Sequence, residues 1–79
     1  MTNLDKYRNI FLETFSLADD FDVENLKFQQ IQEWDSVGHM DLIASLEDEF
    51  DIMFDTEEII GLNSYARGIE MLKEHAIEF

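Results

Sequence analysis

Residues 33–50, EWDSVGHMDLIASLEDEF, decide the fold. Apolar residues recur along this stretch at steps of three and four, which is the period of an amphipathic helix. We expect the helix to begin at Ser36 or Val37 and to end near Phe50. Its buried stripe is predicted to comprise Val37, Met40, Ile43, Leu46 and Phe50, broadened by Leu42. The opposite side should be strongly acidic, because four acids lie largely off the stripe: Asp41, Glu47, Asp48 and Glu49.

Ser36 stands at the predicted start of this helix. A serine at that position usually caps the helix, because its oxygen accepts a hydrogen bond from a backbone amide. His39 lies three residues further on, so the spacing would also allow a nucleophile and its base. A capping serine turns its oxygen toward its own backbone, and no glycine-rich oxyanion loop accompanies the pair. We therefore expect that the protein is not an enzyme by itself.

Three more helices are predicted around this central one. The first covers about residues 3–16, with Thr2 and Asp5 at the spacing of a capping box. Its apolar residues are Leu4, Tyr7, Phe11 and Phe15. Thr56 is predicted to cap a short helix, TEEII, and Ser64 a longer one whose apolar residues are Tyr65, Ile69, Leu72 and Ala76. The predicted fold class is all-α: a small bundle of three main helices and one short helix.

A long connection, LADDFDVENLKFQQIQEWD at residues 17–35, joins the first two main helices. It lacks sustained helical periodicity, and connections of this length in a compact domain are usually functional or held by their own side chains. The predicted anchors are Phe21, Leu26, Phe28 and Ile31. We interpret Trp34 as a packing residue beside the helix start, with a binding aromatic as the alternative.

The chain has 79 residues, which predicts a single domain over residues 1–79 with a thin core. The formal net charge of −14 disfavours nucleic acid and anionic membranes and attracts basic protein surfaces. A hydrophobic content of 46% favours a folded domain over acid-driven disorder. The sequence has no signal peptide pattern, no bilayer-spanning run and no cysteine. We expect a cytoplasmic monomer that does not insert into membranes.

Metal binding is not predicted. An EF-hand loop beginning at Asp20 fails, since Asn25 takes the place of its glycine and Ile31 that of its glutamate. The two histidines, His39 and His75, lie on different predicted helices without a metal-ligand signature. We interpret both as ordinary surface or boundary residues.

The stretch around Ser36 resembles the acyl carrier protein family. Asp35, Ser36 and Val37 match the Asp-Ser-Leu signature at the start of that family's second helix, and the apolar register continues through Met40, Leu42, Ile43, Leu46, Glu47, Glu49 and Phe50. The likeness extends over almost the whole chain in helix order, length, acidity and the long first connection. It implies that the Ser36 hydroxyl is esterified by 4′-phosphopantetheine from coenzyme A, whose thiol carries acyl or aminoacyl groups as thioesters.

The same resemblance implies partners and further site residues. A phosphopantetheinyl transferase would install the arm, and loading, synthase and transferase enzymes with basic patches would read the surface. The implied partner-binding residues, beside Asp35 at the attachment point, are Val37, Met40, Asp41, Glu47, Asp48, Glu57 and Glu58. The implied acyl-pocket candidates are Met40, Leu46, Ile60 and Ile69, for which a plain hydrophobic core is the alternative.

Four positions depart from the family pattern: Trp34, Val37, Asp51 and Asp55. Asp51 replaces a common glycine, and aspartate tolerates a left-handed conformation, so the turn can survive. These departures leave both fatty-acid and specialised-metabolite, polysaccharide or aminoacyl pathways open. Two other functions also stay open: an unmodified acidic helical module that binds a basic partner, and a divalent-cation sensor.

Overall fold

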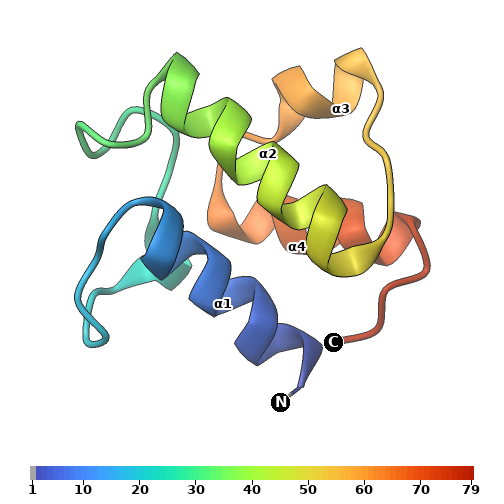
Figure 1. Cartoon of the computed structure of the whole chain (residues 1–79), viewed down its shortest axis with the longest axis horizontal. Coiled ribbons are helices and arrows are strands. Elements are labelled where there is room, and N and C mark those ends of the chain that lie inside the picture. Colours follow the sequence, from blue (N-terminus) through green and yellow to red (C-terminus); the bar gives the residue numbers. More distant parts are fainter. Residues whose placement is uncertain (1) are drawn as a thin grey trace.

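The computed structural model describes residues 2–79, and within them four α-helices make up the fold (Figure 1). Its helices are α1 (Asn3–Thr14), α2 (Ser36–Phe50), α3 (Thr56–Gly61) and α4 (Tyr65–Glu74), with a short 3₁₀ turn, η1 (Val23–Asn25), in the first connection. Within residues 2–79 no strand forms, and only an isolated bridge joins Lys27 to Ser64. The predicted all-α class, with three longer helices and one short one, is confirmed.

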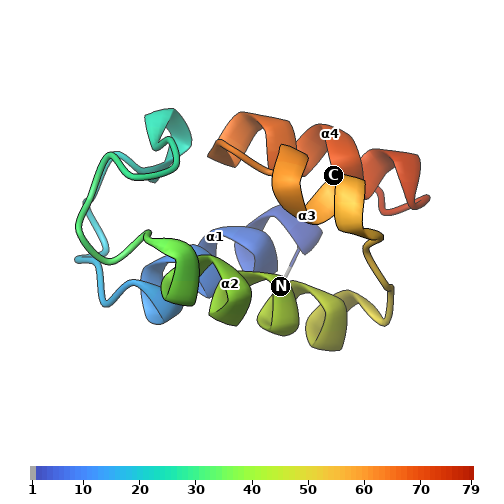
Figure 2. The same cartoon turned by 90° about the horizontal axis from the view of Figure 1, so that it is seen from above.

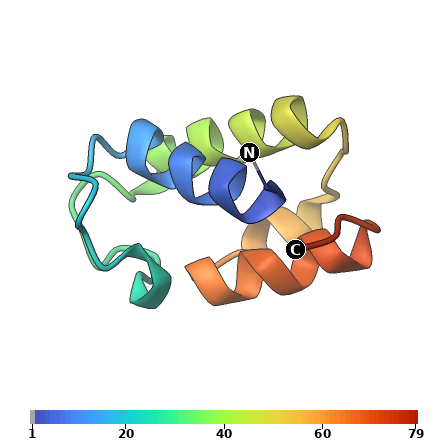
Figure 3. The same cartoon turned by 90° about the horizontal axis from the view of Figure 1, so that it is seen from below.

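Helices α1 and α2 lie side by side and run in opposite directions (Figure 1). Seen from above, α3 lies across the space between α2 and α4 (Figure 2). Seen from below, α1 lies in front of α2 and α4, on the side away from α3 (Figure 3). The core is therefore enclosed by α1 on one side, whereas the short α3 closes the other.

An aromatic cluster forms the centre of this core, and Phe11 on α1 lies at its middle. The Phe11 ring centroid is 4.9 Å from that of Tyr7, 5.0 Å from Tyr65 and 5.5 Å from Trp34. Phe15 stacks on Trp34 with centroids 5.4 Å apart. The Trp34 side chain has no exposed surface, so its interpretation as a packing residue is confirmed.

The residues that cap the helices confirm two predictions and correct a third. Thr2 and Asp5 form the predicted capping box, and Ser64 caps α4 as expected. Helix α3 is capped by Asp55 and not by Thr56, because Asp55 and Glu58 exchange reciprocal hydrogen bonds as a second capping box.

The predicted C-terminal ends of α1 and α4 lie too far along the chain. Helix α1 ends at Thr14, before Ser16, which has a φ of 54°. Helix α4 ends at Glu74, and Ala76 lies beyond it with a φ of 66°. Asp51, in contrast, adopts the expected left-handed conformation at the end of α2.

The long first connection is held in place by backbone hydrogen bonds to the segment before α4. The Phe28 amide donates to Asn63 O (2.9 Å), and the Tyr65 amide donates to Leu26 O (2.9 Å). Arg8 on α1 donates to Asp19 O, which holds the other end of the connection. Of the predicted anchors, Leu26 is buried, whereas Phe21, Phe28 and Ile31 are half-buried against the core. Val23, which the sequence did not single out, is fully buried.

Tyr7 on α1 packs directly against Gly68 on α4. The Tyr7 hydroxyl donates to Tyr65 O at 2.7 Å, and it does so through the space that a Cβ at position 68 would fill. Burial raises the pKa of Tyr7, and burial followed by the charge of Glu24 raises the pKa of Tyr65 to about 12. Both phenols therefore stay neutral, and the Tyr7 hydroxyl keeps its proton for this bond, well into the alkaline range.

We predict that Gly68→Ala lowers the free energy of unfolding by about 1–3 kcal/mol, because the new methyl group overlaps the Tyr7 hydroxyl. Gly61→Ala is the matched control, since a Cβ there meets only Met71 Cε at 3.6 Å, an ordinary contact. We expect this control to be neutral or stabilising by about 0.5–1 kcal/mol. Urea unfolding followed by circular dichroism measures both; equal losses would contradict the close approach.

Candidate functional site

The first turn of α2 presents Ser36 to solvent. The helix is capped by Asp35, whose Oδ1 accepts from the Gly38 amide at 2.8 Å, while Asp35 O accepts from the His39 amide at 2.8 Å. Ser36 is the first helical residue and exposed, so the prediction that it caps the helix is wrong. Its neighbour on the N-terminal side performs that role. The Ser36 hydroxyl is consequently not required by the fold.

Two features favour an anion beside this hydroxyl. The amides of Ser36 and Val37 precede the first intrahelical hydrogen bond, so they point out of the helix end toward solvent. The helix dipole adds a partial positive charge at the same end. Gly38 allows the chain to turn tightly into the helix, because a Cβ there would overlap the Glu33 carbonyl. The arrangement suits a phosphate group bonded to the serine oxygen.

One turn further along α2, His39 joins three parts of the fold. The Trp34 indole N–H donates to His39 Nδ1 at 3.0 Å, and the other ring nitrogen, Nε2, lies 2.7 Å from Ile59 O on α3. Because an indole nitrogen can only donate, Nδ1 must accept, and the proton of the neutral imidazole resides on Nε2. Both ring nitrogens are therefore engaged away from Ser36. This geometry does not provide a base for the serine.

Three apolar side chains near Ser36 face solvent: Val37 is 73% exposed, Met40 52% and Ile60 76%. Val37 and Met40 were predicted to belong to the buried stripe of α2, and that prediction is wrong. The buried residues of α2 are Leu42, Ile43 and Leu46, which lie from the middle of the helix onward, whereas Val37 and Met40 lie toward its N-terminal end. An exposed apolar patch, Val37, Met40 and Ile60, results.

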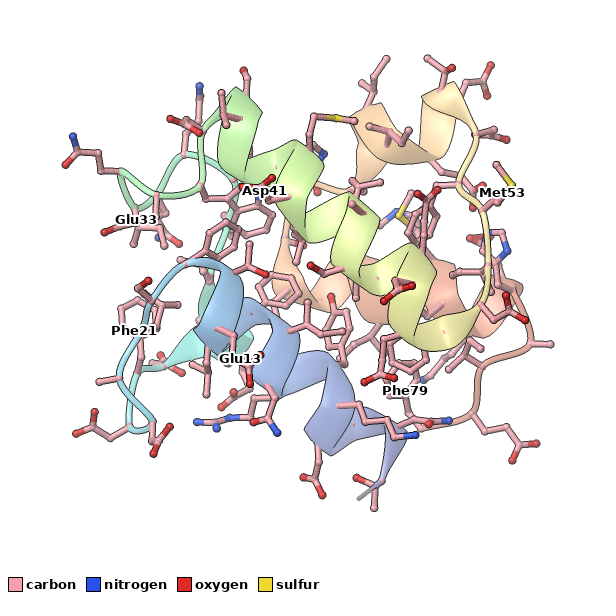
Figure 4. All side chains as sticks on the ribbon, in the orientation of Figure 1. Glu13, Phe21, Glu33, Asp41, Met53 and Phe79 are labelled. Atoms are coloured by element: carbon pink, nitrogen blue, oxygen red, sulfur yellow. The ribbon has the colours of Figure 1, made fainter. Side chains whose placement is uncertain are left out.

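The acidic partner-binding candidates divide into two groups. Asp41, Asp48 and Glu57 are exposed, and Figure 4 shows Asp41 beside the α2 ribbon. Glu47 is half-buried, and its Oε2 accepts from the Phe54 amide at 2.9 Å. Glu58 is half-buried as well and contacts both Asp55 and His75. Glu47 and Glu58 thus form hydrogen bonds within the fold. The prediction that Glu47 belongs to an exposed acidic side of α2 is corrected, because this side chain is half-buried.

No lysine or arginine occurs in the sequence between Lys27 and Arg67, although Arg67 lines a surface hollow together with Glu57 and Glu58 of α3. The exposed acids of α2 therefore produce a predominantly negative field on that helix. Such a field speeds the encounter with a basic protein surface in a salt-dependent way.

An apolar hollow of about 210 Å³ lies between α2, α3 and the long connection. It is lined by Phe28, His39, Ile59, Ile60, Leu62 and Asn63. Of the four acyl-pocket candidates, Ile60 lines this hollow, whereas Leu46 is fully buried in the core. Met40 belongs to the exposed patch, and Ile69 is half-buried on α4. The structure does not bring these four side chains together in the hollow.

The sequence missed five of the six lining residues. Phe28 was named as an anchor and His39 as a boundary histidine, but neither was assigned to a hollow. For His39, the signal in the sequence is Trp34 five residues earlier. A buried indole needs a hydrogen-bond acceptor, and an imidazole nitrogen is one. Ile59, Leu62 and Asn63 carry no comparable signal, because α3 is too short to show a helical period.

Residues 2–79 contain neither a metal-binding cluster nor a helix that could span a membrane. No group of three or more His, Cys, Asp or Glu side chains is placed to hold a metal ion in this part of the chain. Each of its helices is too short or too polar to cross a lipid bilayer. Comparisons of the chain with protein-family models, with curated proteins and with solved structures find no match in any of the three.

We predict that Asp35→Ala lowers the free energy of unfolding by about 1 kcal/mol, because it removes the cap from α2. Asp35→Asn keeps an acceptor at the same position and should retain most of the stability. Ser36→Ala should change the free energy of unfolding by less than about 0.5 kcal/mol, since Ser36 is exposed and does not cap. Chemical denaturation measures all three; a larger loss for Ser36→Ala would restore it as the cap.

Proposed function

We propose that this protein is a carrier that holds acyl intermediates as thioesters on a 4′-phosphopantetheine arm attached to Ser36. The observation that carries the proposal is that Ser36 is exposed at the mouth of α2 while Asp35 performs the capping. A serine that the helix does not need is free for modification. The Asp-Ser-Val motif, the negative field and the apolar patch add independent support.

The residues around Ser36 fit such a group. The phosphodiester would lie beside the outward-pointing amides of Ser36 and Val37, where the helix dipole favours an anion. When bound, the arm supplies the reactive thiol, which the cysteine-free chain does not have. The protein itself positions the attachment oxygen on a rigid helix and presents a surface for recognition. The chemistry of loading and transfer would belong to partner enzymes.

The surface around Ser36 would be read by partners in two ways. The exposed apolar patch, Val37, Met40 and Ile60, offers area for a short hydrophobic contact. The exposed acids beside it, Asp41, Asp48 and Glu57, would pair with lysine and arginine of a phosphopantetheinyl transferase and of loading or synthase enzymes. We place this carrier in the cytoplasm.

The second candidate function is an unmodified acidic module that binds a basic partner through the same surface. The exposed apolar patch and the negative field support it equally well. It differs from the carrier in one respect, because it has no need for a serine hydroxyl at position 36. Modification of that hydroxyl therefore separates the two functions.

We predict that a phosphopantetheinyl transferase of broad specificity, given coenzyme A and Mg²⁺, adds the mass of one phosphopantetheine to the protein. Ser36→Ala should abolish the gain, and Ser45→Ala, on the same helix, should retain it. Intact-protein mass spectrometry measures the product. If the chain keeps its bare mass while an established carrier in the same tube is converted, the unmodified module is the better account.

We also predict that Asp41→Lys combined with Asp48→Lys lowers kcat/KM of that modification by about tenfold, because it removes attraction to a basic enzyme surface. The defect should shrink as salt rises, since salt screens exposed charges. The control is Glu13→Lys on α1, an exposed acid away from Ser36 (Figure 4). A similar loss in the control would show that total charge, and not the α2 surface, governs the encounter.

A further inference from the structure

Helix α3 is held in place largely by polar contacts with its neighbours. None of its six residues is buried. His39 on α2 donates to Ile59 O at 2.7 Å, and the His75 ring, directly after α4, lies 2.7 Å from Glu58 Oε2. The chain has two histidines, so both of them contact this one short helix, each from a different neighbour.

His39 can make its two hydrogen bonds only while the imidazole is neutral. Its Nδ1 accepts from the Trp34 indole N–H at 3.0 Å, and an indole nitrogen can only donate. Protonation of His39 places a hydrogen on Nδ1, so two N–H groups would then face each other across this distance. The hydrogen bond would be replaced by a repulsive contact beside a buried ring.

The imidazole has to move in that event, because the indole cannot. Trp34 has no exposed surface and contacts three phenylalanine rings of the core. His39 is half-buried, so its ring can move toward solvent. Since the ring joins Trp34 to Ile59 O, it can leave the indole and keep the carbonyl only if α3 moves with it. In either case α3 changes its position relative to α2.

The two ends of α3 are anchored by other contacts. Before it, the buried Phe54 donates through its amide to Glu47 Oε2 at 2.9 Å. After it, Leu62 is buried, and the Asn63 carbonyl accepts from the Phe28 amide. The segment between these anchors can therefore move as one short lid while the core stays closed.

We infer that His39 is a proton-operated switch, which holds α3 against α2 when it is neutral and releases α3 when it is protonated. Imidazole is the side chain whose charge ordinarily changes between about pH 5 and 8. His75 acts on the same helix in the opposite direction, because its protonation turns the contact with Glu58 into an ion pair. Acid therefore weakens the attachment of α3 to α2 and strengthens its attachment to α4.

Within residues 2–79, no charged side chain forms a hydrogen bond or an ion pair with the His39 ring. The hollow that this ring lines contains no charged residue either. The titratable groups of the elements around it are exposed or bonded elsewhere: Asp35 and Asp41 on α2, Lys27 and Glu33 in the long connection, and Asp55, Glu57 and Glu58 around α3. The response is therefore assigned to the ring itself.

The switch acts on the exposed apolar patch. Val37 and Met40 belong to α2, whereas Ile60 belongs to α3 and follows the residue whose carbonyl His39 holds. The His39 contact thus fixes the spacing between the two parts of the patch, and protonation separates them. This consequence for partner recognition rests on the proposed function, whereas the switch itself does not.

The first test follows the indole N–H signal of Trp34, the one tryptophan of the chain, by proton–nitrogen NMR of the full protein from about pH 8 to about pH 5. We expect this signal to shift together with the ring nitrogen signals of His39. Amide hydrogen exchange in α3, corrected for its intrinsic pH dependence, should accelerate relative to α1 by about fivefold or more. An indole signal that stays constant down to about pH 5 overturns the inference.

Two variants separate the histidines. In His75→Gln the indole response should persist, and α3 exchange should accelerate further in acid, because the contact with α4 no longer strengthens. In His39→Gln the carboxamide can accept from Trp34 and donate to Ile59 O but does not titrate, so both responses should disappear. A response that survives in His39→Gln, or is lost in His75→Gln, contradicts the assignment. If His39→Gln does not fold, the wild type and His75→Gln decide it.

A further measurement concerns the patch. At each pH, kcat/KM of the transferase for the wild type is divided by the value for His39→Gln, so that the pH dependence of the enzyme cancels. We expect a ratio near one at about pH 8 and a fall of about threefold or more toward about pH 6, because Ile60 leaves the recognised surface. A constant ratio with a titrating indole contradicts control of the patch. A protein that is modified at no pH contradicts the carrier function, and the indole titration still decides the switch.

Discussion

The fold depends on one requirement: the buried indole of Trp34 must find an acceptor for its single N–H. Its ring completes the aromatic core with Phe11 and Phe15, so it cannot turn toward solvent without opening that core. His39 supplies the acceptor from the first turns of α2 and is thereby fixed in tautomer and orientation. The same imidazole then reaches α3 through Ile59 O. The two hydrogen bonds of this imidazole thus join the aromatic core, the first turns of α2 and the short α3.

The sequence predicted the helices well because their periods and caps are local. Thr2, Asp5 and Ser64 act as the spacing indicated. The errors at Ser36 and Thr56 have a single cause: in each case an aspartate precedes the hydroxyl residue, and both types are good caps. Which of the two takes the cap depends on where the helix begins to pack, and tertiary contacts determine that.

Helical periodicity alone could not predict that Val37 and Met40 are exposed. Helical periodicity indicates which residues share one face of a helix. How much of that face the core covers depends on the neighbouring helices. Here the core covers Leu42, Ile43 and Leu46, and the short α3 leaves the N-terminal end of the stripe open. The hollow was hidden for the same reason, because Phe28 and Ile59 meet only in three dimensions. The candidate serine was therefore predictable, whereas its surroundings were not.

The two sides of this molecule differ in how firmly they are held. On the α1 side, stacked aromatic rings and the Tyr7 hydroxyl bond resist opening. On the α3 side, few apolar contacts are buried and single hydrogen bonds from His39 and His75 hold the helix. Segments with little buried apolar surface open at the lowest free energy, so motion should concentrate at α3. Ser36 begins the same helix whose His39 contacts α3, so the proposed carrier would pass its cargo to an enzyme while the α1 side of the core stays closed.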